Sequence, residues 1–351
     1  FPYSCGTTAA GYNKRRFEAA GIDHEPKTAE EVVEFTKMMT DVGKKQYGIS
    51  MFLKKGSFGS YWMAGVSNGA FGGRWMKPDF HCGLSEKEAV SGIQWSKDMI
   101  PYAPPGCVNF DISEAIQAFI NASVGISIMY MVYHTTMWGT PQVKKEDVGY
   151  FLMPASEKAP SWVTKLYSGL WGNWSVGVSV DSKRKQMAYD FCQWHNNKDV
   201  HTRWCEAGGP PNRHSEWMND KILQYQGYPP LYEYFTSPIA NPCTRVKLPE
   251  WESLSEIGGT WGNAAWAGIE TPQKAMDNAV RDSDSVMTMA GYYKEGAVAY
   301  YTPKVSIAVS QDDLKWFNKP NDYWVWRTNN NYVGTKPEVL DYVNKWIATH
   351  K

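Results

Sequence analysis

The sequence lacks an excess of charge of either sign. Its 351 residues include 36 Lys and Arg against 36 Asp and Glu, so the formal net charge at pH 7 is zero. This balance argues against a nucleic-acid-binding surface, which requires a clustered basic footprint. The chain also has no run of about 18 or more apolar residues, as a membrane-spanning helix requires. Its apolar stretch at 124–132 is too short to cross a bilayer.

Several short motifs of common catalytic and metal sites are also missing. The sequence has no P-loop GxxxxGK[ST], no metalloprotease HExxH and no dinucleotide-binding GxGxxG. No two cysteines form a CxxC pair and no Cys/His cluster has zinc spacing, so we expect no metal site and no cofactor. We expect no catalytic residue either. A glycoside hydrolase stays open as an alternative, because its paired carboxylates come from separate segments.

Six cysteines are present, and an even number without metal spacing suits disulfides in an oxidising compartment. One pair would close a loop and a second would join two successive helices, which leaves a third pair between distant segments. These pairs are Cys82–Cys107, Cys192–Cys205 and Cys5–Cys243. The sequence does not fix this connectivity, and scattered buried thiols are the alternative.

Aromatic residues are abundant, with 17 Trp and 21 Tyr. Any single ring is readily explained by core packing. Such rings also stack on the apolar faces of sugars while their polar edges bond to hydroxyl groups. The excess therefore favours a carbohydrate or polyol ligand.

The order of helix and strand patterns predicts an α/β fold. Thr28 followed by Glu31 forms a capping box before a helix that ends by Gly43, and Thr271-Pro272 marks another helix start. Helices are predicted at 85–100, 113–122, from Ser182, at 199–207, at 275–290 and near 337–349. Strands are predicted at 47–52, 124–132 and 175–180.

Six segments, taken in order, resemble one known family. They are Pro2-Tyr3 with Tyr12-Asn13-Lys14, Trp62 with Asn68-Gly69, the segment 119–129, Trp171-Gly172-Asn173-Trp174-Ser175, Gly208-Gly209-Pro210-Pro211 with Arg213, and Leu248-Pro249-Glu250-Trp251. This pattern is similar to the extracellular solute-binding proteins of sugar ABC transporters, to which maltose-binding protein belongs.

The resemblance implies the two-lobed periplasmic-binding-protein type II fold, with α/β lobes that close by hinge motion. Residues 1–170 would follow the first hinge crossing into the second lobe. Residues 171–242 would return to the first lobe, 243–292 would form closing helices of the second lobe, and 293–351 would be a C-terminal extension. Hinge positions are expected at 2–5, 174–178 and 241–246.

Family members carry a long segment before this point that forms most of the first lobe's sheet. The sequence begins at Phe1, without an initiator Met or a signal peptide. We therefore expect this chain to be the C-terminal portion of a longer protein, with an incomplete first lobe. The missing segment, or another chain, would complete that lobe.

The resemblance also implies a set of ligand-binding residues. Aromatic rings would stack on the ligand, and Arg213 would pair with vicinal hydroxyl groups. The expected residues are Thr7, Phe58, Tyr61, Trp62, Tyr130, Tyr133, Trp171, Asn173, Trp174, Arg213 and Trp251.

The function implied is that of a non-catalytic protein that captures a sugar or polyol between its lobes. It would deliver this ligand to the permease subunits of an ABC importer from the periplasm or the cell surface. A receptor that presents the bound sugar to a chemosensor is the alternative within the same fold.

Overall fold

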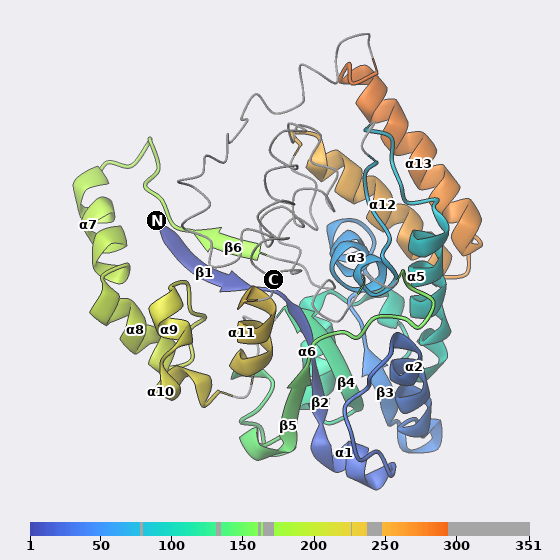
Figure 1. The fold of residues 1–351 in the computed structure, drawn as a ribbon, viewed down its shortest axis with the longest axis horizontal. Helices are drawn as coiled ribbons and strands as arrows, with labels where there is room; N and C mark the ends of the chain where they lie inside the picture. Colours follow the sequence, from blue (N-terminus) through green and yellow to red (C-terminus); the bar gives the residue numbers. More distant parts are fainter. Residues whose placement is uncertain are drawn as a thin grey trace, which may run out of the picture.

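A four-stranded mixed sheet carries the larger part of the molecule (Figure 1). Its strands lie in the order β3 (Tyr47–Ser50), β4 (Val124–Tyr130), β2 (Thr8–Asn13) and β5 (Val148–Phe151). β3 runs parallel to β4, whereas β2 runs antiparallel to both β4 and β5. The computed structural model describes residues 1–77, 80–130, 135–160, 163, 172–225, 227–236 and 248–293.

Both faces of this sheet are buried, which explains why β4 reads as an almost unbroken apolar run. The registered pair Ala10 and Ile128 belongs to one hydrophobic core. The next pair, Ala9 and Met129, belongs to a second core. Successive side chains of a strand point to opposite faces, so the sheet separates the two cores.

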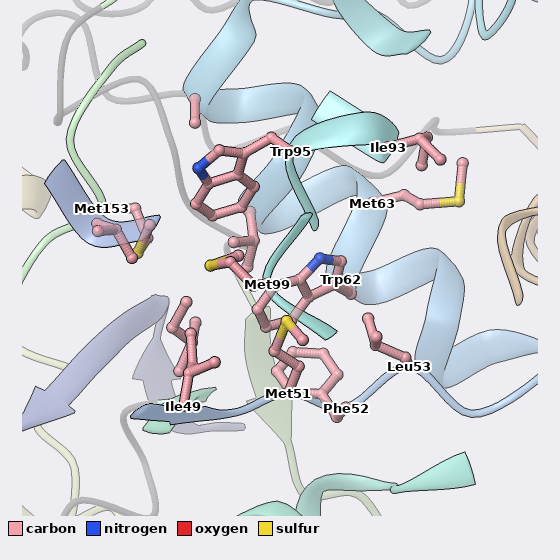
Figure 2. Close-up of a cluster of buried hydrophobic side chains, with 14 of the residues drawn as sticks. Ile49, Met51, Phe52, Leu53, Trp62, Met63, Ile93, Trp95, Met99 and Met153 are labelled. Carbon is pink, nitrogen blue, oxygen red and sulfur yellow. The ribbon is translucent and has the colours of Figure 1, made fainter. Parts of the chain in front are cut away.

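The first core lies between the sheet and a group of helices on its right in Figure 1. Trp62, Trp95 and Met99 meet at its centre (Figure 2), and the two indole rings are stacked with centroids 6.5 Å apart. The helices that contribute are α2 (Ala29–Met38), α3 (Ser57–Trp62), α4 (Asn68–Phe71), α5 (Lys87–Asp98), α12 (Trp251–Trp266) and α13 (Pro272–Met289). The short helix α1 (Lys14–Ala19) adds Phe17.

The second core packs α6 (Ile112–Ile120) and the helices from the later part of the chain against the other face. Phe119, Tyr228 and Leu231 are fully buried there. The later helices are α8 (Lys198–Glu206), α9 (His214–Trp217), α10 (Asp220–Leu223) and α11 (Tyr228–Thr236).

A separate two-stranded ribbon precedes the main sheet. β1 (Pro2–Gly6) pairs antiparallel with β6 (Gly172–Ser175), and β1 leads directly into β2 (Figure 1). The strand predicted at 175–180 is wrong in its position, because pairing with β1 covers 172–175 instead. Alternating side chains alone do not reveal which residues find a partner strand.

Helix α7 (Lys185–His195) follows the ribbon and has an unusual surface. Met187, Phe191 and Trp194, which the sequence places at helical spacing, are 64%, 56% and 58% exposed. Such clustered exposed apolar side chains commonly mark an interaction surface.

The helix starts predicted at Thr28 and Thr271 are confirmed, whereas the helix predicted from Ser182 begins at Lys185. The Thr28 hydroxyl accepts the backbone N–H of Glu31 at 3.1 Å, and the Thr271 hydroxyl accepts that of Lys274 at 3.3 Å. Each cap satisfies one of the amide groups left unbonded at a helix start. The helix predicted near 337–349 lies outside the described residues.

Two of the predicted disulfides are wrong. Cys82, Cys107, Cys192 and Cys205 are free and buried. Cys107 donates to the carbonyl of Met51 at 3.4 Å, and burial raises its thiol pKa to about 12. These four thiols therefore pack as small apolar groups. This is the alternative to disulfides that an even number of cysteines does not exclude. The pair Cys5–Cys243 involves Cys243, which lies outside the described residues.

A close crossing of α3 and α12 supplies the first testable prediction. The Ser60 and Ser255 hydroxyl oxygens lie 2.5 Å apart, and a Cβ at Gly259 would overlap the carbonyl of Gly56. We expect Gly259→Ala to lower the free energy of unfolding by about 1–3 kcal/mol because the helices must separate. Urea unfolding measures this loss.

The matched control is Gly177→Ala, where an added Cβ meets nothing within 4 Å. Its effect should stay within about 0.5 kcal/mol. Equal stabilities of the two variants would contradict the packing argument.

Candidate ligand-binding site

Four strand ends meet at one edge of the main sheet. β3, β4 and β5 end there, and β2 begins there because it runs antiparallel to β4 and β5. The ribbon of β1 and β6 leaves the sheet at this same edge (Figure 1). Ligands of α/β proteins commonly bind outside the carboxyl ends of strands. This edge is therefore the candidate site.

Thr7 lies at the junction between β1 and β2. It is completely buried, and its hydroxyl has no hydrogen-bond partner among the described residues. The neighbouring Thr8 hydroxyl donates to the carbonyl of Gly65 at 3.1 Å. A buried hydroxyl without a partner costs free energy unless water or a ligand group bonds to it.

Tyr130 ends β4 opposite Thr8. Its ring is buried, and its hydroxyl donates to the carbonyl of Gly6 at 2.9 Å. This bond attaches the end of β1 to the main sheet. Tyr133 lies outside the described residues.

The ribbon places Trp174 beside β1. In the register of the two strands, Trp174 faces Ser4, Asn173 faces Cys5 and Gly172 faces Gly6. The Trp174 side chain is 56% exposed, so a flat ring is available on the ribbon opposite Ser4. Trp171 and the side chain of Asn173 lie outside the described part of the chain.

Helix α3 gives the other aromatic residues different surroundings. Phe58 and Tyr61 are partly buried, with ring centroids 6.5 Å apart, and thus keep some exposed surface. Trp62 is completely buried in the first core, and its indole N–H donates to the Ser96 hydroxyl at 2.8 Å (Figure 2). The Trp62 ring is therefore a packing group of the first core.

Arg213 and Trp251 also have partners within the protein. The Arg213 guanidinium donates to the carbonyl of Asn196 and lies 3.4 Å from the Glu216 carboxylate. Trp251 is 7% exposed and packs edge-on against Trp75 in the first core.

One polar residue near the edge was not foreseen as a site residue. Asn68 is buried, and neither its amide oxygen nor its amide nitrogen has a partner among the described residues. It lies three residues after Gly65, whose carbonyl accepts from the Thr8 hydroxyl. A polar side chain within an otherwise apolar helix was the available signal.

The same helix contains Gly65-Val66-Ser67-Asn68-Gly69, which fits the GxSxG pattern of serine hydrolases. In those enzymes the serine sits on a strand-to-helix turn and is exposed. Here Ser67 ends the π-helical turn Met63–Ser67, is completely buried and donates to the carbonyl of Met63. Ser67 is therefore not placed as the nucleophile of a serine hydrolase would be.

A buried polar cluster lies beside β1, formed by His201, Cys205 and Glu216. Their possible metal-ligating atoms lie within 4.8 Å of one another. His201 Nδ1 and Glu216 Oε1 are 2.7 Å apart, a hydrogen-bond distance, and Arg213 provides a cation near the same oxygen. Arg213 therefore supplies positive charge beside the Glu216 carboxylate without a metal ion. We interpret the cluster as a hydrogen-bond network.

The network controls ionisation of its members. Burial alone would raise the pKa of Glu216, but hydrogen bonds from His201 and from the amides of Asn212 and Arg213 lower it below its usual range. Burial and the nearby Glu216 charge raise the pKa of the Cys205 thiol. The cluster is therefore expected to hold a carboxylate beside a neutral thiol.

Glu216→Gln tests this network. Removing one partner of a buried ion pair typically costs about 3–5 kcal/mol, and we expect a loss in that range at pH 7. Because the folded pKa is lowered, the Glu216 contribution exists above its unfolded value of about 4.3 and disappears as the pH falls through the folded value. The difference from the parent should therefore shrink in acid.

Urea unfolding at pH 7 and at pH values below 4 would measure both differences. The control is Glu146→Gln, because Glu146 is exposed. A loss for Glu216→Gln that is the same at every pH would contradict the ionised network.

A probable amino-acid ABC transporter periplasmic-binding protein of Sinorhizobium fredii is 25% identical over 293 residues. The match includes 81% of this chain, and the chain spans 63% of that relative's length.

Solved structures show the fold. A solute-binding protein of Agrobacterium radiobacter in complex with ribitol is 25% identical, with a TM-score of 0.68 over 82% of this chain and 71% of that one. One from Agrobacterium vitis with D-mannitol is 22% identical, with a TM-score of 0.72 over 84% and 73%. One from Thermotoga lettingae with α-D-tagatose is 19% identical, with a TM-score of 0.71 over 82% and 72%.

These likenesses confirm the predicted α/β, two-lobed periplasmic-binding-protein fold. None of the described helices is both long and apolar enough to cross a membrane. The family model of the bacterial extracellular solute-binding proteins matches residues 1–200, more than half of the chain. The chain therefore belongs to the bacterial extracellular solute-binding proteins.

Proposed function

We propose that this protein captures a sugar or polyol at the hinge edge of the main sheet and delivers it to an ABC importer, without catalysis. The observation that carries the proposal is the exposed Trp174 ring on the ribbon that leads to the β1–β2 junction, where the buried Thr7 hydroxyl has no partner among the described residues. A flat ring and a neutral hydrogen-bonding group are the two elements that sugar recognition needs.

The chemistry of the proposed residues favours a neutral ligand. Thr7, Phe58, Tyr61, Tyr130 and Trp174 carry no charge at neutral pH. An amino acid, as the name of the Sinorhizobium relative suggests, would require charged partners for its ammonium and carboxylate groups. The ribitol, D-mannitol and α-D-tagatose bound by the similar structures are neutral. Tyr133, Trp171 and Asn173 remain in the proposed site from the family pattern.

We propose the lobe division on the same basis. Residues 1–170 and 243–292 would form one lobe, and 171–242 would belong to the other. The exposed apolar surface of α7 supports a first lobe that is completed by residues outside this sequence. The 293–351 extension has no assigned role.

The cellular setting follows from the family. An extracellular solute-binding protein acts in the periplasm or at the cell surface and presents its closed form to permease subunits. A chemosensory receptor would recognise the same closed form, so transport assays in cells must separate these two roles.

Calorimetric titration tests the ligand. We expect saturable binding of ribitol, D-mannitol, D-tagatose or maltose, with no binding of glutamate or lysine. Trp174→Ala should weaken the affinity by about tenfold, since a lost ring stack is worth about 0.5–1.5 kcal/mol in addition to the apolar area that it buries.

The matched control is Trp194→Ala on α7, because this ring is exposed to a similar extent, 58% against 56%. Tight binding of an amino acid, or equal affinities of the two alanine variants, would overturn the proposal. Release of a cleaved sugar would support the glycoside hydrolase instead.

A further inference from the structure

We infer that the end of the main sheet away from the candidate ligand-binding site carries a second site, where Arg16 binds a small organic anion. β2 ends there and β3 and β4 begin there, and Figure 1 shows α1 at the opposite end of β2 from β1. None of the residues proposed to bind the sugar or polyol lines this site. The inference therefore does not depend on the proposed function.

The site is a cavity of about 590 Å³ between α1, the turn that follows α2 and the loop before β5. Cavities of this size accept small molecules. Part of its lining is apolar and includes Ala20, Met38, Ala122 and Pro141. The Met38 side chain is 52% exposed, so it offers apolar surface to a ligand.

Arg16 provides the charge of the cavity. Its guanidinium donates to the carbonyls of Ala122 at 3.3 Å, Met39 at 2.5 Å and Tyr47 at 3.2 Å. No carboxylate among the described residues pairs with it, and burial lowers the pKa of Arg16 below its usual value. A half-buried positive charge that meets only neutral oxygens gains free energy when an anion joins it.

The Arg16 guanidinium also keeps donors for such an anion. A guanidinium has five N–H groups, and three of them bond to the carbonyls. The Nε–H and one N–H of Nη1 make no hydrogen bond within the described part of the chain. Hydrogen bonds from these groups to an anion would be charge-assisted and therefore strong.

The other charges around the cavity balance one another. Lys44 pairs with Asp41 at 3.0 Å, and Arg15 pairs with Asp147 at 2.8 Å. The charge of Arg16 is then the unbalanced one among the described groups of the lining. A monoanion would neutralise it, whereas a dianion would add excess negative charge. The preferred ligand therefore carries a single negative charge.

The apolar walls indicate what the anionic group is attached to. A guanidinium binds a carboxylate through charge-assisted hydrogen bonds, and the adjoining Ala20, Met38 and Pro141 would cover a hydrocarbon chain. Inorganic phosphate would use the charge but leave these walls uncovered. The ligand is therefore a small organic monocarboxylate.

Calorimetric titration of the full chain with hexanoate tests this assignment. Hexanamide has the same hydrocarbon chain without the charge, and inorganic phosphate has the charge without the chain. We expect saturable binding of hexanoate that is at least about tenfold tighter than that of either comparison compound, because only hexanoate uses both the guanidinium and the walls.

A variant on α1 locates the binding, since replacing Arg16 itself would leave three carbonyls without their donor. Ala19→Glu places a carboxylate three residues after Arg16, where side chains of a helix are neighbours. Ala19 is exposed and lines the cavity, so we expect an unchanged thermal midpoint. The added carboxylate should weaken hexanoate binding by at least about tenfold, because it occupies the guanidinium.

The matched control is Ala19→Gln, which adds a side chain of the same size without charge and should weaken binding by less than about threefold. Absence of hexanoate binding, equal affinities for hexanoate and hexanamide, or equal affinities of the two variants would overturn the inference. Phosphate binding as tight as that of hexanoate would also overturn it, because the walls would then contribute nothing. Failure of the sugar titrations would leave this result unaffected.

Discussion

The antiparallel direction of β2 is the constraint on which the rest of the structure depends. A chain that entered a fully parallel sheet would start its strand at the edge opposite the carboxyl ends of its neighbours. Here β2 begins where β3, β4 and β5 end, so the crossing at Thr7 enters at the edge where α3 and Tyr130 also lie. One strand direction thus brings the β1–β2 junction to the same edge as the proposed binding groups.

Local signals gave the helices and the central strand because their causes are local. The hydroxyls of Thr28 and Thr271 cap helices through bonds to residues three positions away, and β4 is apolar because both of its faces are covered. The site was harder to predict. Trp62 and Trp174 are equally suited to packing and to stacking, and only the tertiary burial of one ring distinguishes them. Arg213 was expected to meet a ligand, but Glu216 lies one helical turn away.

The polar network around His201 could not have been predicted from spacing. His201 and Cys205 lie one turn apart on α8, but the Tyr3 carbonyl of β1 that His201 contacts lies 198 residues earlier. Burying these groups is costly unless each finds a partner. The network meets that cost by bonding helix, turn and strand to one another, so a single set of contacts both satisfies the charges and orients β1.

The surface of α7 has a practical consequence for the choice of reagents. Its exposed Met187, Phe191 and Trp194 form an apolar surface that is separate from the edge of the main sheet. Flat organic molecules can bind nonspecifically to such a surface. Nitrophenyl glycosides, dye-labelled sugars and environment-sensitive fluorophores would partition onto these rings and mimic specific recognition. Underivatised sugars and polyols are therefore the appropriate screening compounds, and the isolated chain is best kept dilute.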